Sequence, residues 1–126
     1  MLKPQKEELE IKGDDRGNFM EIFKIPGRGQ VNYSTTQPGI TRGNHYHNRK
    51  EEYFCVISGE AEIKLRNRDT NEIQEFKVSG QKPETVKIPI NWTHNITNTG
   101  NGPMELLIWV NEVFDPEDPD TFYEKV

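Results

Sequence analysis

Short strand-like segments separated by turn residues are the feature that most constrains the fold of this chain. Apolar and charged residues alternate along 61–66, which is typical of a strand with one solvent-exposed face. The run 14–18 is a strong turn between two further segments, 9–12 and 19–24, and predicts a hairpin. The segment 104–110 is almost wholly apolar and predicts a strand in the middle of a sheet. The pattern therefore predicts an all-β sandwich or barrel.

The remaining segments continue this pattern. Further strands are predicted at 30–37, 52–57, 73–78, 86–89 and 94–97. Helical periodicity nowhere extends over more than about ten residues, and a short helical turn is expected only near 118–123. A chain of 126 residues is long enough for one core and too short for two, so we expect a single domain over 1–126.

Charge and hydropathy exclude several functions. The formal net charge is −5 and no run of basic residues occurs, which argues against nucleic acid or an anionic membrane as the main partner. No stretch reaches the roughly 18 apolar residues of a membrane span. The first residues lack the apolar core of a signal peptide, and the single cysteine, Cys55, excludes an internal disulfide. We therefore expect a cytoplasmic protein.

All three histidines of the chain belong to one candidate site. His45 and His47 are two residues apart, so on a strand their side chains point to the same face. A short turn then brings Glu52 to the start of the next strand, and His94 follows a proline-bearing turn. Imidazoles and a carboxylate on neighbouring strands suit a borderline or hard divalent ion. The pattern predicts one metal ion, zinc in the first place, with nickel, manganese or iron as alternatives.

These residues resemble the motifs of the cupin superfamily. The spacing of the first cupin motif is matched by Gly39, His45, His47, Glu52 and Gly59. The second motif is matched by Pro89, His94 and Asn98, while Asn91 and Pro83 stand where it has glycines. The resemblance implies a cupin double-stranded β-helix, which is a jelly-roll barrel. It also implies that the metal ligands are His45, His47, Glu52 and His94.

A narrower resemblance extends over nearly the whole chain, in blocks at 15–19, 41–47, 88–96 and 109–121. These blocks look like the C-terminal cupin domain of the bifunctional epimerase–reductases of capsular polysaccharide synthesis. In that family the cupin domain epimerises C3 of a UDP-linked 4-keto-6-deoxy-N-acetylhexosamine, and a fused nucleotide-binding domain reduces the 4-keto group with NADPH. The resemblance implies a sugar-nucleotide epimerase that uses no NAD(P) itself, with reduction left to a separate NADPH-dependent reductase.

Epimerisation beside a ketone sets the roles of the other candidate residues. Removal of the proton next to the ketone generates an enolate, which a Lewis acid stabilises. Because every histidine is assigned to the metal, the candidate bases are Lys50 and Tyr53, with Tyr33, Tyr46 and Lys64 also open. Arg42 is expected to bind the substrate diphosphate. Trp92, in the turn before His94, is expected to wall the pocket.

Three other functions stay open. In the metal-independent dTDP-4-keto-sugar 3,5-epimerases the histidine of an Arg-Gly-x-His element is the proton-abstracting base, which gives His45 a second candidate role. A histidine-rich cupin site also suits a metal-dependent oxygenase. Alternatively, a cupin of this kind binds a sugar without turnover.

The organisation expected for the cupin domain has three parts. Strands that carry the metal site are placed at about 30–110, after N-terminal strands at 9–24 and before a C-terminal tail at 111–126. Within the central part, 52–57 and 104–110 are apolar on both faces. One small barrel interior does not need this much apolar surface, so we expect a homodimer built through β-strands.

Overall fold

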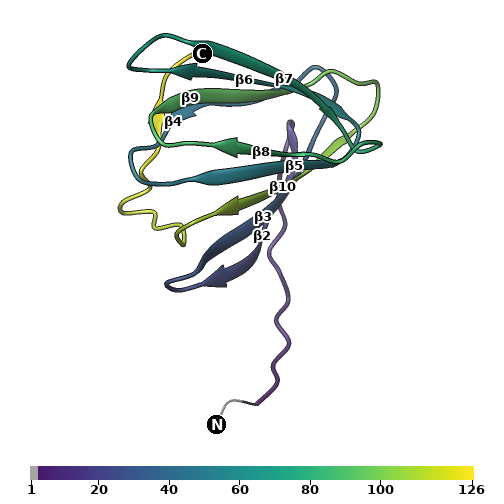
Figure 1. Ribbon diagram of the computed structural model, residues 1–126. Coiled ribbons are helices and arrows are strands. Elements are labelled where there is room, and N and C mark those ends of the chain that lie inside the picture. Colours follow the sequence, from purple (N-terminus) through teal and green to yellow (C-terminus); the bar gives the residue numbers. More distant parts are fainter. Residues whose placement is uncertain (1–2) are drawn as a thin grey trace.

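The protein consists of two antiparallel β-sheets that face each other, seen in a computed structural model that describes residues 3–126 (Figure 1). The six-stranded sheet has the order β1 (Lys12–Asp14), β2 (Gly17–Ile25), β3 (Gly29–Thr36), β10 (Met104–Val110), β5 (Glu52–Ser58) and β8 (Thr85–Ile88). The five-stranded sheet has the order β11 (Phe122–Tyr123), β4 (Thr41–Tyr46), β9 (Trp92–Asn98), β6 (Glu60–Asn67) and β7 (Ile73–Ser79). Residues 3–126 contain no helix, so none could cross a membrane, and the all-β prediction is confirmed.

The core lies between the two sheets and follows from strand alternation. On β6, Ala61, Ile63 and Leu65 are at most 2% exposed, while the charged residues between them face outward. β10 runs between β3 and β5, as its apolar sequence predicts. The buried apolar side chains from both sheets are Phe54, Val56, Ala61, Ile63, Leu65, Val78, Val86, Ile88, Ile96, Met104 and Leu106. They fill one end of the interior and leave the other end to polar residues.

A β-bulge in β4 decides which side chains reach that polar end. Gly43 and Asn44 both have positive φ angles, 99° and 58°, and the register between β4 and β9 shifts there. The extra residue changes the alternation, so Arg42 pairs with buried Ile96 and His45 pairs with buried His94. Arg42 and His45 therefore face the interior together, although their odd spacing would place them on opposite faces of a regular strand.

The helical turn expected near 118–123 is wrong, whereas the hairpin around 14–18 forms with a shorter first strand than expected. The segment near 118–123 does not form a helical turn but ends in β11, which pairs with β4. The backbone groups of this segment bond to the edge of β4 and to the loop after it, rather than to each other. At the N-terminal end, pairing stops at Lys12 opposite Phe19, and 9–11 belong to an exposed extended arm (Figure 1). Leu9 and Ile11 are 39% and 63% exposed there.

The bulge gives a test of the fold. A Cβ atom on Gly43 would lie 3.0 Å from the His94 carbonyl oxygen, whereas one on Gly39, also at positive φ, would meet nothing within 4 Å. Gly43→Ala should lower the free energy of unfolding by about 2–3 kcal/mol, and Gly39→Ala by only about 1 kcal/mol. Urea denaturation of both variants measures the difference. Equal losses would show that the bulge is not what requires Gly43.

Candidate metal centre

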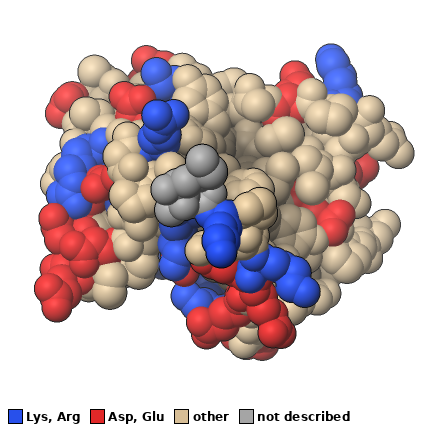
Figure 2. Space-filling view, turned by 90° about the horizontal axis from the view of Figure 1, so that it is seen from below, with Lys and Arg blue, Asp and Glu red and all other residues tan. Residues whose placement is uncertain are grey.

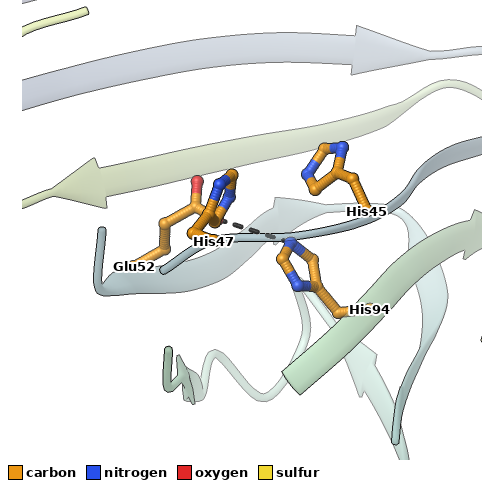
Figure 3. A group of neighbouring side chains, drawn as sticks. All are labelled: His45, His47, Glu52 and His94. Carbon is orange, nitrogen blue, oxygen red and sulfur yellow. Dashed lines mark hydrogen bonds and ion pairs between the residues drawn. The ribbon is translucent and has the colours of Figure 1, made fainter. Parts of the chain in front are cut away.

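Four side chains from both sheets converge at the polar end of the interior. His45 lies on β4, His47 directly after it, Glu52 at the start of β5 and His94 on β9. One nitrogen or carboxylate oxygen from each lies within 4.8 Å of the others, and the side chains point toward one another in Figure 3. The histidine ring centroids are 4.7–5.4 Å apart. The tertiary structure thus brings together the four residues named from the sequence.

Backbone carbonyl groups orient two of these rings. His47 Nδ1 lies 2.7 Å from the carbonyl oxygen of Asp120, and His94 Nδ1 lies 3.0 Å from that of Trp92. A carbonyl oxygen can only accept, so both Nδ1 atoms carry the proton and both Nε2 atoms turn toward the cluster. His94 Nε2 is buried without a hydrogen-bond partner among the described residues, 3.4 Å from Glu52 Oε1. A buried nitrogen lone pair aimed at a carboxylate is what a bound cation would satisfy.

The charge states of the cluster also suit a cation. Burial alone would raise the pKa of Glu52, but its contacts with His47 and His94 outweigh burial and hold the pKa below its ordinary value. Burial, together with the neighbouring His94 and His47, lowers the pKa of His45 to about 3. Burial would also lower the pKa of His47, but the hydrogen bond and charge of Glu52 raise it. The centre therefore combines an ionised carboxylate with at least one neutral imidazole.

Three nitrogens and one oxygen form a donor set that can hold a divalent metal ion. Zinc, nickel, manganese and iron all accept imidazole and carboxylate ligands, so the donor atoms do not select among them.

A cavity of about 290 Å³ opens beside the four side chains. Its apolar wall is formed by Phe19, Phe54, Ile96, Leu106, Ile108, Val110 and Phe114. The polar part includes Arg42 and Lys50, both named as candidates from the sequence, and Arg16, which was not. The size is near the lower limit of ligand pockets, about 300 Å³, and has room for a single sugar ring rather than a whole nucleotide sugar.

Two arginines line the cavity. Arg42 donates from Nε to Thr36 Oγ1 at 2.9 Å and from Nη2 to the Thr35 carbonyl at 3.0 Å, which leaves its other N–H groups available. Burial and the charge of Arg16 lower the pKa of Arg42. Arg16 is held by Asp14 at 2.7 Å. Its position in the turn 14–18 gave no chemical signal by itself; only the bulge and the hairpin bring the two guanidinium groups to one cavity.

Of the five candidate bases, Lys50 lines the cavity and the other four do not. Lys50 is 6% exposed and lines the cavity, and its Nζ donates to the Pro119 carbonyl at 2.6 Å. Tyr53 points to the opposite face of β5, where its ring packs against Trp109 with centroids 5.9 Å apart. The other three candidates are also engaged away from the cavity. Tyr33 bonds to Glu105, Tyr46 stacks on Phe122 and Lys64 pairs with Glu75.

Trp92 does not wall this cavity. It packs against the apolar core at the start of β9 and faces a separate hollow between Leu65 and Pro89. A polar row that the sequence analysis did not name lies on β3 instead. Gln30 is 2% exposed and donates to Glu21 at 2.7 Å and to Asn32 at 2.8 Å. Polar residues at every second position of 30–36 were the available signal for this row.

Comparison with known proteins places these features in a family. Residues 12–122 match the family of polysaccharide biosynthesis C-terminal domains. The capsular polysaccharide assembling protein CapF of Staphylococcus aureus superposes with a TM-score of 0.92 at 48% identity, over 96% of this chain and 35% of CapF. A UDP-2-acetamido-2,6-beta-L-arabino-hexul-4-ose reductase of Pseudomonas aeruginosa is 44% identical over 91% of this chain and 31% of its own length. Oxalate decarboxylase shares the fold, with a TM-score of 0.71 at 22% identity.

Fold and site therefore define a cupin, as the sequence motifs predict. Within the cupins, the chain belongs to the polysaccharide biosynthesis C-terminal domain family. It spans about one third of the length of CapF and of the Pseudomonas reductase.

Proposed function

We propose that this protein is a metal-dependent sugar-nucleotide epimerase of capsular or surface polysaccharide biosynthesis, acting at C3 of a UDP-linked 4-keto-6-deoxy-N-acetylhexosamine. The observation that carries the proposal is the convergence of His45, His47, Glu52 and His94 at one cavity. The relatives support the sugar class. One is named for a UDP-linked acetamido 4-keto sugar, and another, 23% identical, as a probable epimerase of low-salt glycan biosynthesis in Haloferax volcanii.

The cavity suits the reacting ring of such a substrate. A volume of about 290 Å³ would hold the sugar, with the nucleotide left outside. Arg42 and Arg16 line the same cavity, and guanidinium groups bind phosphate oxygens in a fixed fork geometry. We assign the substrate diphosphate to this pair.

The reaction moves a proton and no electrons. A divalent ion held by the three histidines and Glu52 would supply Lewis-acid polarisation of the ketone oxygen. Lys50 is the candidate base that lines the cavity, and in this proposal its amine takes the proton from C3. Solvent water would deliver a proton to the opposite face of C3, which completes the inversion, and the proton taken by Lys50 would pass to solvent. Because oxidation states are unchanged, no nicotinamide takes part in this step, and an NADPH-dependent reductase would act on the product. The single free thiol, Cys55, fits the cytoplasm as the compartment.

Metal binding is the first test. The protein should bind one divalent ion per chain, and His94→Ala should weaken binding by on the order of 100-fold or more, since it removes a direct ligand. Thr97→Ala, on the outer face of the same strand, is the matched control. Elemental analysis and titration after removal of metal by a chelator measure both. A wild-type protein that binds no divalent ion would favour the metal-independent reaction with His45 as base.

Proton exchange tests the chemistry. In deuterated water the UDP-4-keto sugar should gain one deuterium next to the ketone without NAD(P), as read by mass spectrometry or proton NMR. Lys50→Met should slow the exchange by on the order of 100-fold or more, the usual contribution of a general base. Tyr53→Phe should leave it unchanged. Exchange at the wild-type rate in Lys50→Met would exclude Lys50, and no exchange above the uncatalysed rate would leave a non-catalytic sugar-binding cupin.

The outer face of the six-stranded sheet supports a homodimer. Phe23, Tyr53 and Trp109 lie there, exposed by 59%, 40% and 37%. The view of the molecule from below shows uncharged stretches between its charged groups (Figure 2). A second copy of the same sheet would cover this surface, because identical apolar faces are self-complementary.

A measurement of the oligomeric state in solution tests the proposed dimer. Light scattering at micromolar concentration should give the mass of two chains, and Trp109→Glu should give the mass of one by placing a charge in the contact. Phe76→Glu changes a similarly exposed aromatic residue on the five-stranded sheet, 38% exposed, and should remain dimeric. A wild-type monomer under these conditions would rule out the dimer.

A further inference from the structure

The C-terminal segment closes on the loop that follows His47. Asp120 is only 4% exposed, and its carboxylate accepts hydrogen bonds from the backbone N–H groups of Asn48, Arg49 and Lys50 at 3.0, 2.9 and 3.0 Å. The backbone carbonyl of the same residue accepts the Nδ1–H of His47 at 2.7 Å. One residue of the C-terminal segment therefore holds both the ring of His47 and the loop next to it.

The two contacts of Asp120 depend on each other. Its φ angle is +50°, a conformation that aspartate and asparagine adopt more readily than most residues. In this conformation the side chain reaches the loop while the carbonyl faces His47. Loss of the carboxylate contacts would leave the segment held only on either side, at Pro119 and β11, and would loosen the carbonyl against the ring.

The other nitrogen of His47 explains why this contact matters. His47 Nε2 lies 3.0 Å from Glu52 Oε1, so the ring stands between two acceptors. Without a fixed carbonyl at Nδ1, the proton could move to Nε2 and bond to Glu52, which would remove a metal-binding lone pair. Partners of this kind typically change metal affinity by about 10–100-fold.

We propose that Asp120 is a positioning residue that fixes the orientation and tautomer of His47, and thereby sets how tightly the centre holds its metal ion. The inference rests on the proposed metal site. It extends that site to a residue that is distant in the sequence. Of the four ligands, only His47 receives a hydrogen bond from Asp120 or donates one to it.

Three variants separate the contacts. Asp120→Asn keeps the backbone conformation but turns an amide N–H₂ toward at least one of the backbone N–H groups. Asp120→Gly also tolerates the positive φ and removes all three side-chain contacts. Asp118→Asn is the control, since Asp118 is an exposed carboxylate of the same segment that pairs with Arg49 at 3.0 Å.

Zinc affinity of the full chain, measured by competition with a chromophoric chelator, is the first measurement. Asp120→Gly should bind zinc about 10–100-fold more weakly than wild type, Asp120→Asn should be intermediate and Asp118→Asn unchanged. Circular dichroism and urea denaturation of the metal-free proteins establish that each variant is folded. If Asp120→Gly does not fold, Asp120→Asn carries the test. A folded Asp120 variant with wild-type zinc affinity would overturn the proposal.

A second measurement distinguishes this inference from the metal proposal. Long-range proton–nitrogen NMR of the metal-free protein at alkaline pH reports which ring nitrogen of His47 carries the proton. Wild type and Asp118→Asn should show the proton on Nδ1, and the Asp120 variants a mixture. If wild type binds no metal but shows this change, the metal proposal fails and the positioning role holds. An unchanged tautomer in the Asp120 variants would refute the positioning role even where metal binds.

Discussion

The burial of the Glu52 carboxylate between histidines is the interaction on which the rest of the site depends. Taking an ionised carboxylate out of water costs several kcal/mol unless it is compensated. Glu52 comes from the six-stranded sheet, whereas His45 and His94 come from the five-stranded sheet. The compensation therefore requires both sheets in register. A cation at this point would satisfy the carboxylate and the unpaired His94 Nε2 together.

The remaining groups of the site are positioned by irregular backbone rather than by regular strands. The bulge at Gly43 and Asn44 turns Arg42 and His45 into the same interior. Asp120 and β11 then fasten the loop after His47 from the other end of the chain. The packed apolar residues between the sheets provide the frame, and these local irregularities place functional side chains at the cavity.

The groups assigned to the proposed reaction all border the same cavity. The ligand cluster, the buried Lys50 and the two arginines line one cavity of about 290 Å³. The buried polar groups among them, His47, His94 and Lys50, are shielded from water, so they act on a bound substrate more strongly than they would at the surface. The relatives share the polysaccharide setting, and the residues of this chain supply a physical reason for a proton-transfer role within it.

The sequence by itself determined the fold class and the four candidate ligands. Strand alternation and turn residues are local signals, and the spacing of His45, His47 and Glu52 is set within one short stretch of chain, 45–52. The tertiary structure alone decided which other residues join them. It turned Trp92 away from the cavity and brought in Arg16 and Asp120, whereas Tyr53 faces outward by the strand alternation that points its neighbour Glu52 inward. It also replaced the expected helical turn near 118–123 with a strand. These outcomes depend on a bulge that changes the facing of side chains and on contacts between residues about 70 positions apart, and no local pattern encodes either.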